Sequence, residues 1–586
     1  MSSDTVTQPA QSRSAPAPGW RRRLRAFGYV PRREPGVTER LEPPYRRSGA
    51  RLLQVAGVPA ATALRIARLG AWGGPLLVAL FAGVLRFVNL SSPRAVIFDE
   101  TYYAKDAWSL LQLGYEGSWP KDANDKLLDD PQVIPLSEDP GYVVHPPVGK
   151  WMIALGEWAF GLEPFGWRFV VALLGTLSVL MLCRIGRRLF RSTLLGCLAG
   201  LLLAVDGLHF VMSRTALLDL VLMFWVLAAF GCLLVDRDRA RERLAAALPA
   251  GRPDDAVASG LRLGTRPWRL AAGVCMGLAL GTKWNALFIL AAFGLLTVLW
   301  DAGARRTAGS RRPYARALRL DVVPAFFSTV PVAAGVYVAS WTGWFASDNG
   351  YFRGWAEDRD TAFPFIPDAV RSLWHYHAVV YRFHVNLDSG HTYDSNPWSW
   401  PVVGRPVSYF WDDPRPGEDG CPAGATENCA REVLALGTPL LWWLGVAAAV
   451  YALYRWGLRR DWRAGAILCG LAAGWVPWLF YQERTIFLFY AVVFVPYLCL
   501  AVTMMLGAMA RAGTAALAGQ GTVASGSGPA PGPAQPTEWR RAAGVVAAGV
   551  LVLLVLWNFI YFWPIYTGET ITRDAWEARM WLGSWV

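Results

Sequence analysis

The sequence predicts an all-α polytopic membrane protein with about eleven transmembrane helices and two long extracytoplasmic loops. Of its 586 residues, 54% are hydrophobic and only 17% are charged, whereas soluble domains carry about 25% charged residues. The apolar residues come in runs of about 20, the length that spans a bilayer. The basic residues concentrate in alternate connections between these runs, which is typical of cytoplasmic loops.

Each apolar run is predicted to be one membrane-spanning helix, because about 20 helical residues cross a hydrocarbon core of about 30 Å. Two pairs of runs form tight hairpins, so the count of eleven is open by about one or two helices. The predicted spans are residues 72–90, 168–186, 193–211, 216–235, 269–282, 284–300, 322–343, 436–457, 463–481, 486–508 and 542–563.

Four regions follow from this pattern. Residues 1–70 form a basic cytoplasmic tail that we expect to be largely disordered, and residues 71–510 form the transmembrane core. Residues 511–541 are rich in Gly, Ala, Ser and Pro, which predicts a flexible cytoplasmic linker. Residues 542–586 hold the last transmembrane helix and an outer C-terminal segment.

Charge segregation predicts the orientation. If residues 1–70 are cytoplasmic, the inside segments carry 38 basic and 13 acidic side chains. The outside loops 91–165 and 344–435 carry 5 basic against 12 acidic and 7 basic against 13 acidic side chains, respectively. We therefore expect the N-terminus inside, the C-terminus outside and the chemistry on the outer face. The net charge of +13 then marks a membrane face, not a nucleic-acid partner.

Two adjacent carboxylates, Asp99 and Glu100, stand where the chain leaves the first predicted span. A carboxylate near an apolar boundary has a raised pKa, which suits it to abstract a proton. The alternative is a helix N-terminus whose acids complement the helix dipole. His145 lies in a Pro-Pro turn of the same loop and is a candidate for contact with substrate or with this pair, a structural role being the alternative.

Four cations lie at the predicted outer boundary of the membrane, namely Arg168, Arg214, Lys283 and Arg484. Ionisable groups at this depth are costly and point to function. Arginine and lysine suit the phosphate of a lipid that arrives from the outer leaflet. The alternatives are snorkelling and internal pairing, for which Arg214 with Asp219 is a candidate.

The second outer loop offers histidines, an aromatic stretch and two cysteines. Its four histidines raise the alternative of a zinc site, but suitably spaced Cys or acidic ligands are lacking, so we expect no metal. Residues 391–401 combine aromatic, Pro and polar side chains, a composition that suits sugar or peptide binding or else a packed loop. Cys421 and Cys429 lie close together outside the membrane, where oxidation is permitted, and are predicted to form a disulfide.

Read in order, the motifs resemble the protein O-mannosyltransferases, glycosyltransferase family 39, and in particular the actinobacterial enzymes. The resemblance covers about residues 72–586 and depends on the joint order of the motifs, since each alone is weak. After the Asp-Glu pair come His-Pro-Pro-Val-Gly-Lys (145–150), Trp-Arg (167–168), Ser-Arg-Thr-Ala-Leu-Leu-Asp (213–219), Gly-Thr-Lys-Trp-Asn (281–285) and Thr-Tyr-x-Ser-x-Pro-Trp-x-Trp-Pro (392–401).

The resemblance implies a GT-C glycosyltransferase fold in the cell membrane. It implies inverting transfer of mannose from polyprenyl-phosphate mannose to Ser/Thr hydroxyls of secreted or membrane proteins, on the outer face and without a metal or other cofactor. Membrane lipids and the secretion translocon are the further partners to expect. Asp99 is the expected general base, with Glu100 positioning the acceptor or donor. The candidates for the lipid phosphate are Arg168, Lys283, Arg484 and Arg214, and those for sugar or acceptor are His145, Tyr393, Lys150 and Trp400.

Two other functions stay open. A related GT-C transferase that acts on a glycolipid or a cell-wall glycan shares the fold and the acidic loop, and activity on Ser/Thr peptides separates the two. A transporter or flippase favours paired internal repeats and broken helices near the membrane midplane. The sequence shows no convincing repeat, and its charges cluster on one side instead.

Overall fold

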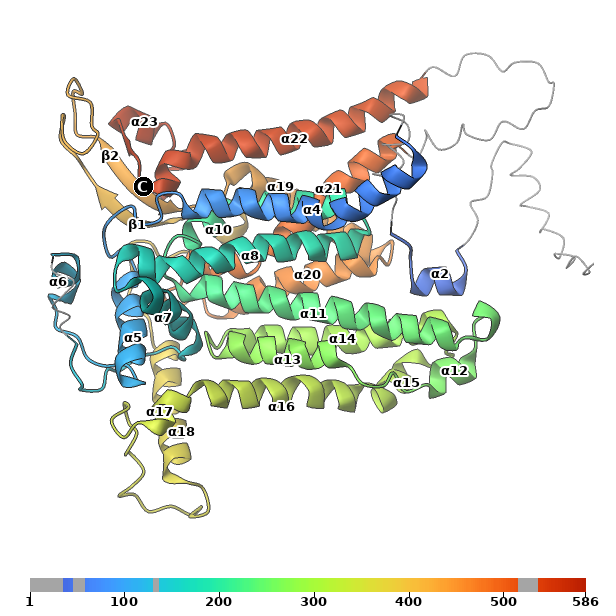
Figure 1. The fold of residues 1–586 in the computed structure, drawn as a ribbon, viewed down its shortest axis with the longest axis horizontal. Helices are drawn as coiled ribbons and strands as arrows, with labels where there is room; N and C mark the ends of the chain where they lie inside the picture. The colour runs from blue at the N-terminus through green and yellow to red at the C-terminus, as the bar shows by residue number, and fades with distance from the viewer. Residues whose placement is uncertain (1–34, 46–57, 130–135, 515–535) are drawn as a thin grey trace, which may run out of the picture.

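Long helices lie side by side in one bundle, while short helices and a small sheet gather at one end of it (Figure 1). The predicted all-α membrane class is confirmed. Much of the predicted tail, 1–70, and of the predicted linker, 511–541, lies outside the described residues. The computed structural model describes residues 35–45, 58–129, 136–514 and 536–586.

Each of the eleven predicted spans contains a helix in the described part of the chain. Six of these helices, and α20 together with the 3-10 helix η3 that continues it, are long and apolar enough to cross a membrane, and α9, α13 and the apolar part of α21 are shorter. This is the architecture of a multi-pass membrane protein. The helices are α4 (Ala60–Phe87), α8 (Pro164–Phe190), α9 (Thr193–Ala204), α11 (Leu218–Ala247), α13 (Pro267–Leu280), α14 (Ala286–Ala308), α16 (Val322–Ser340), α19 (Pro439–Gly457), α20 (Trp462–Trp475), α21 (Val495–Thr514) and α22 (Pro536–Thr567).

Shorter elements cover the ends of the bundle. Those from the two predicted outer loops lie together at one end, where α5, α7 and α18 run across the long helices (Figure 1). From these loops come α5 (Glu100–Leu113), α6 (Ala123–Asp129), α7 (Val148–Phe160), α17 (Thr342–Ala346), α18 (Asp368–Val385), η2 (Pro397–Val402), β1 (Val407–Asp412) and β2 (Ala430–Ala435). The remaining short elements are α2 (Val37–Leu41), α10 (Gly207–Met212), η1 (Pro249–Gly251), α12 (Asp255–Gly260), α15 (Pro313–Leu320), η3 (Val476–Phe480), η4 (Leu488–Val493), β3 (Thr570–Ile571), α23 (Arg573–Glu577) and η6 (Gly583–Trp585).

The centre of the bundle is formed by α8 and α11. More than half of their most apolar stretch is buried, against about one-sixth for α4 and α16. The outer helices turn large apolar side chains away from the protein, including Leu77, Phe327 and Leu553. An apolar exterior around a packed centre suits a lipid environment, in which each helix satisfies its own backbone hydrogen bonds.

The third predicted span, 193–211, is broken into α9 and α10. Asp206 begins α10, and its Oδ1 accepts the backbone N–H of His209 at 2.9 Å, the contact typical of a helix N-cap. The apolar run predicted one helix because hydrophobicity does not report an internal cap.

The small antiparallel sheet has the order β1-β2-β3, with a bulge between Ser408 and Phe410. β2 also packs on α10 and α22, so the sheet connects the second predicted outer loop to the last long helix. It fixes β1 beside the first residues of α5, where the candidate site begins.

Candidate active site

A strained turn sets the direction of the two adjacent carboxylates. Asp99 is the N-cap residue of α5 and Glu100 its first residue. Phe98, just before them, has φ +47°, a left-handed conformation that costs a bulky residue about 1–3 kcal/mol. Its ring stacks on Tyr409 of β1 at 4.6 Å and meets Phe489 of η4 edge-on at 5.5 Å. These contacts hold the turn.

Glu100 is completely buried and all of its oxygen contacts are internal. Both carboxylate oxygens accept hydrogen bonds from Arg168, from Nε and Nη2, at 2.8 Å each. Backbone N–H groups of Ile97 and Ala216 donate at 3.1 and 3.0 Å. Glu100 therefore ties the start of α5 to α8 and to the segment before α11.

The guanidinium groups of Arg168 and Arg214 make hydrogen bonds within the protein. Besides its contacts with Glu100, Arg168 donates to three backbone carbonyls at 2.9–3.3 Å. Arg214 donates to carbonyls at the end of α4 and just after it, among them Arg86 and Asn89 at 2.8 and 2.7 Å. This placement argues against their predicted role in binding a lipid phosphate, because the terminal nitrogens of both guanidinium groups already donate to partners within the protein.

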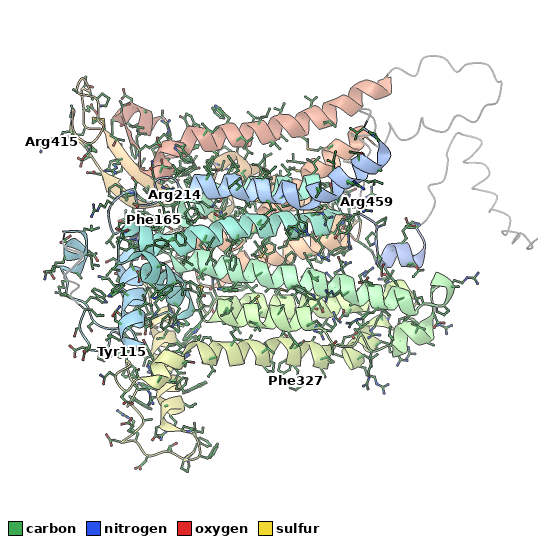
Figure 2. All side chains as sticks on the ribbon, viewed as in Figure 1. Tyr115, Phe165, Arg214, Phe327, Arg415 and Arg459 are labelled. Atoms are coloured by element: carbon green, nitrogen blue, oxygen red, sulfur yellow. A yellow bond between two sulfur atoms is a disulfide. The ribbon has the colours of Figure 1, made fainter. Side chains whose placement is uncertain are left out.

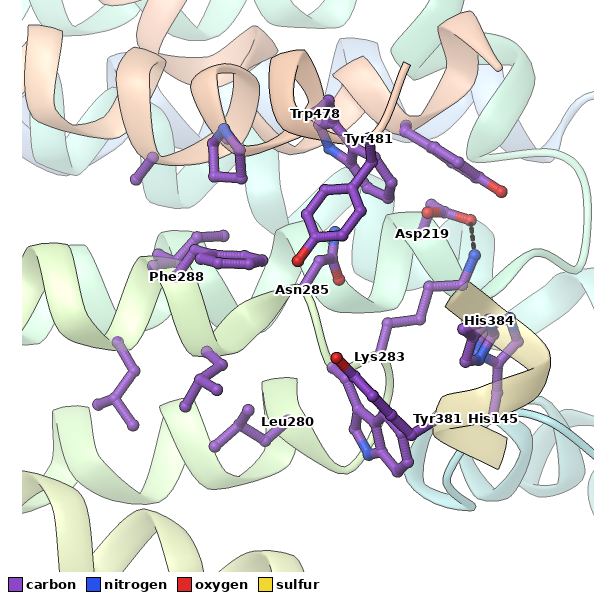
Figure 3. A pocket seen from close by; sticks show the side chains of 18 of the residues that line it. His145, Asp219, Leu280, Lys283, Asn285, Phe288, Tyr381, His384, Trp478 and Tyr481 are labelled. Carbon is purple, nitrogen blue, oxygen red and sulfur yellow. Dashed lines mark hydrogen bonds and ion pairs between the residues drawn. The ribbon is translucent and has the colours of Figure 1, made fainter. Parts of the chain in front are cut away.

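A pocket of about 580 Å³ opens among α14, α16, α18, α20 and η3. Most of its lining is apolar or aromatic, for example Leu280 and Phe288. Figure 3 shows the polar groups gathered at one end, where Lys283 points to Asp219 and His384 lies nearby. A pocket with one apolar part and one cationic end suits an amphiphile that carries an anionic group.

Lys283 and Arg484, two of the four cations predicted to bind the lipid phosphate, both line this pocket. The Nζ of Lys283 donates to Oδ2 of Asp219 at 2.7 Å. The Nη2 of Arg484 donates to Nδ1 of His384 at 3.3 Å, and the Nε of Arg484 has no partner among the described residues. The alternative pair of Arg214 with Asp219 is thus wrong, because Asp219 pairs with Lys283.

Asp99 is not part of the pocket lining but lies near its polar end, because the ring of Tyr103, one turn further along α5, is 6.2 Å from that of the pocket residue His145. Burial raises the pKa of Asp99 to about 6; Lys283 opposes this shift, Asp219 adds to it, and a hydrogen bond with Tyr103 lowers the pKa. Its side chain makes no capping hydrogen bond to α5. A carboxylate that titrates near neutral pH is suited to accept a proton.

The sugar and acceptor candidates separate into two groups. His145 lines the pocket, and its ring stacks on His384 at 5.2 Å. Tyr393 is half-buried and lies outside the pocket lining, with the guanidinium of Arg405 5.9 Å from its ring.

Lys150 and Trp400 are both completely buried. Lys150 pairs with Glu116, and the Nε1 of Trp400 donates to the Ser395 hydroxyl at 2.9 Å. Their burial argues against the predicted contact of either residue with sugar or acceptor.

Two histidines of the second predicted outer loop, His375 and His377, contact aromatic side chains. His375 stacks on Trp355 at 3.8 Å, and His377 hydrogen-bonds Tyr337. Within the described ranges, no three His, Cys, Asp or Glu side chains are grouped as a metal site requires.

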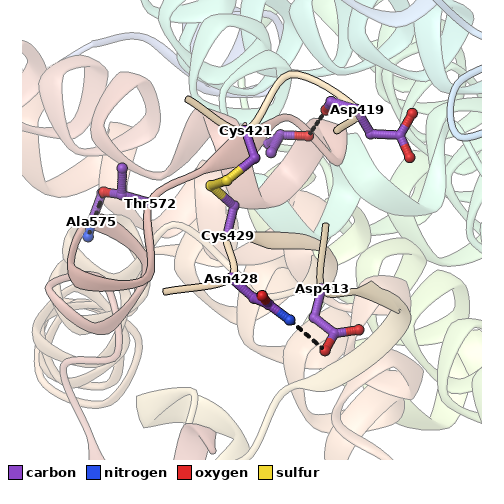
Figure 4. Close-up of a disulfide and its surroundings, with 8 residues drawn as sticks. Asp413, Asp419, Cys421, Asn428, Cys429, Thr572 and Ala575 are labelled. Atoms are coloured by element: carbon purple, nitrogen blue, oxygen red, sulfur yellow. Dashed lines mark hydrogen bonds between the residues drawn. A yellow bond between two sulfur atoms is a disulfide. The ribbon is translucent and has the colours of Figure 1, made fainter. Parts of the chain in front are cut away.

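The structure joins Cys421 to Cys429 by a disulfide, which confirms the predicted pair (Figure 4). The bond closes the connection between β1 and β2, with the two Cα atoms 5.7 Å apart. It therefore ties together the two ends of this loop, and neither cysteine lines the pocket.

Sequence reasoning did not assign Asp219, Trp478 or Tyr490 to the site, although all three line the pocket. For Asp219 a signal was present, since it lies near the start of its predicted span, at the same predicted boundary as Lys283. No sequence feature marked Trp478 or Tyr490, because they are two among the 30 Trp and 20 Tyr of the chain.

The fold is similar to that of a solved yeast structure. A chain of the Saccharomyces cerevisiae protein O-mannosyltransferase Pmt1-Pmt2 complex bound to the sugar donor matches with a TM-score of 0.61 at 14% identity. The match covers 88% of this chain and 92% of that one. The fold is thus that of the GT-C membrane glycosyltransferases.

Sequence comparison is more specific. The family model for dolichyl-phosphate-mannose-protein mannosyltransferase matches residues 76–333, and the model for the C-terminal four-transmembrane region of protein O-mannosyltransferase matches residues 369–585. Curated relatives are named polyprenol-phosphate-mannose–protein mannosyltransferases. Those from Mycolicibacterium smegmatis and Mycobacterium tuberculosis are 40% identical, over 88% and 90% of this chain and 93% and 94% of theirs. The Corynebacterium glutamicum relative is 35% identical over 87% of this chain and 92% of its own. The chain belongs to the protein O-mannosyltransferase family and is a glycosyltransferase.

Proposed function

We propose that this enzyme transfers mannose from polyprenyl-phosphate mannose to Ser or Thr hydroxyls of proteins on the outer face of the cell membrane. The observation that carries the proposal is the pocket whose polar end combines Lys283 and Arg484 next to Asp99. The apolar lining suits the polyprenyl chain, and the two cations suit its phosphate. Acceptors reach the outer face by the secretory route, with the translocon as a candidate neighbour.

The proposed reaction is a single displacement. The acceptor hydroxyl gives its proton to Asp99 while its oxygen bonds to C1 of the sugar. The bond between C1 and the phosphate oxygen breaks, and the electron pair stays on the phosphate. Lys283 and Arg484 stabilise the charge that develops there. The reaction requires no metal or other cofactor, since the leaving phosphate is already a weak base. Attack from the side opposite to the phosphate inverts the anomeric centre.

A direct assay tests this function. Membranes that contain the enzyme are incubated with labelled polyprenyl-phosphate mannose and a Ser/Thr-rich peptide, or with the same peptide in which Ala replaces every Ser and Thr. We expect label in the first peptide only. Label that appears instead in a glycolipid or glycan would contradict the proposal and favour the alternative acceptor class.

The transfer rate should depend on pH through Asp99. Because a general base acts in its ionised form and the pKa of Asp99 is about 6, kcat/KM should be level above about pH 7. It should fall about tenfold per pH unit well below pH 6, where Asp99 is protonated. Initial rates between pH 5 and pH 8 measure this. A level profile down to pH 5 would contradict the assignment of Asp99 as the base.

Arg484→Gln should weaken donor binding, because a hydrogen bond to a charged group contributes about 1.5–3 kcal/mol. We expect the KM for the lipid donor to rise at least tenfold while the KM for the peptide stays unchanged. Arg459→Gln is the matched control, since Arg459 lies at the opposite end of the bundle (Figure 2) and is exposed. Equal donor KM values for the two variants would remove Arg484 from the phosphate site.

The proposed orientation places the pocket end of the bundle outside the cell. Ala362 and Ala246 are exposed positions in the predicted outer and inner segments, and the six free cysteines are buried or half-buried. A membrane-impermeant maleimide should label Ala362→Cys in intact cells, and should label Ala246→Cys only after the cells are opened. The reverse pattern would overturn the orientation.

A further inference from the structure

Asp219 is a pocket residue that the proposed reaction does not use. It is the second residue of α11, is 1% exposed and lines the pocket beside Lys283. Its Oδ2 accepts the hydrogen bond from Lys283, as the dashed line in Figure 3 marks. Its Oδ1 is buried and has no hydrogen-bond partner among the described residues. The carboxylate is therefore only half satisfied.

A half-satisfied buried carboxylate requires an explanation. An ionised carboxylate offers about four acceptor positions, and folded proteins leave few buried polar atoms without a partner. Asp206, another buried acid of this chain, shows the usual arrangement. Its Oδ1 accepts from the backbone of His209 at 2.9 Å and its Oδ2 from the indole of Trp442 at 2.7 Å. Asp219 differs because it lines a pocket, where a ligand can supply the missing donor.

The chemistry of the donor substrate limits what that group is. The polyprenyl chain carries no hydrogen-bond donor, and the phosphate link to the sugar is an anion without a proton near neutral pH. The only donors of polyprenyl-phosphate mannose are the sugar hydroxyls. The sugar is bonded directly to the phosphate that Lys283 is proposed to bind, and Lys283 is hydrogen-bonded to Asp219, so the sugar comes within reach of Asp219.

We propose that Asp219 recognises the transferred sugar, its free oxygen accepting a hydrogen bond from one sugar hydroxyl. This inference rests on the proposed function and adds a specificity residue to it. Asp219 then makes two contacts at once. One oxygen positions the ammonium group of Lys283, which binds the phosphate, and the other accepts a hydrogen bond from the sugar. A sugar that lacks the hydroxyl leaves the oxygen unpaired, and a site built to bind a hydroxyl rejects such an analogue.

The test compares polyprenyl-phosphate mannose with its 2-, 3-, 4- and 6-deoxy analogues. With the wild type, one deoxy donor should have a kcat/KM lower by roughly ten- to hundredfold, the value of a hydrogen bond to a charged group. Asp219→Ala should reduce this ratio to near one and leave the other three ratios unchanged. Asp219→Ala also leaves Lys283 without its partner, which can slow turnover of every donor. The affinity of each analogue is therefore also measured by displacement of bound donor, which requires no turnover, and the same pattern of ratios is expected. Asp219→Asn is measured in the same way.

Asp206→Asn is the matched control, because Asp206 is equally buried but lies outside the pocket lining, and it should keep the wild-type ratios. If Asp219 acts only through Lys283, Asp219→Ala slows all donors equally and the ratios persist, which overturns the inference. A raised peptide KM with unchanged donor ratios assigns Asp219 to the acceptor and overturns it too. A wild type that does not use polyprenyl-phosphate mannose at all contradicts the proposed function instead.

Discussion

Asp99→Asn is expected to lower kcat/KM for mannosyl transfer by about 10²–10⁴-fold, the usual contribution of a general base. Asparagine has the size of aspartate but cannot accept the proton of a Ser or Thr hydroxyl. Phe98, which fixes the turn through Tyr409 and Phe489, is unchanged in this variant. We therefore expect the fold and the donor affinity to stay close to those of the wild type.

Initial rates and a donor-binding titration on the same preparation check this expectation together. Asp122→Asn serves as the control, because Asp122 belongs to the same outer loop but is exposed, with only a surface pair to Lys126. Full activity of a well-folded Asp99→Asn enzyme would remove Asp99 from the reaction. Lost donor binding would instead make it a binding residue.

Glu100→Ala is expected to lower the free energy of unfolding by about 3–5 kcal/mol, the cost of removing one partner from a buried ion pair. The change leaves the guanidinium of Arg168 uncompensated at a position with no solvent exposure. It also removes the acceptor for the backbone N–H groups of Ile97 and Ala216. The adjacent acids Asp99 and Glu100 should thus respond differently, one through the reaction and the other through stability.

Thermal unfolding in detergent measures the second prediction, with Glu138→Ala as the control, because Glu138 is an exposed acid of the same loop. The double variant Glu100→Met, Arg168→Met should lose less stability than the sum of the single changes, since it leaves no unpaired charge. An unfolding temperature of Glu100→Ala equal to that of the wild type would contradict the structural role of the pair.

The sequence could predict the spans and the depth of the charges. Runs of apolar residues indicate which segments cross the membrane, and their ends indicate which ionisable groups lie at the same depth. Lys283 and Arg484, two of the four cations predicted to lie at one depth, line the same pocket. The Cys421–Cys429 disulfide could also be predicted, because the cysteines are eight positions apart in a loop assigned to the oxidising side.

What the sequence could not supply is which groups at one depth face each other. Arg168 and Glu100 are 68 residues apart, and only the packing of α8 on the turn before α5 brings them together. Because of the same packing, Arg168 does not line the pocket. Trp400 was predicted to contact sugar because its stretch is aromatic, yet composition does not distinguish a stacking surface from a packed loop, and this side chain lies in the interior.

The anomeric configuration of the product tests the central claim most directly. Purified enzyme is given polyprenyl-phosphate mannose and a Ser/Thr peptide, and the new sugar–peptide linkage is examined by nuclear magnetic resonance. A single displacement with Asp99 as the base predicts mannose linked to the Ser or Thr oxygen with the configuration opposite to that of the donor. A product with the donor's configuration, or no mannosyl peptide at all, would contradict the proposed mechanism.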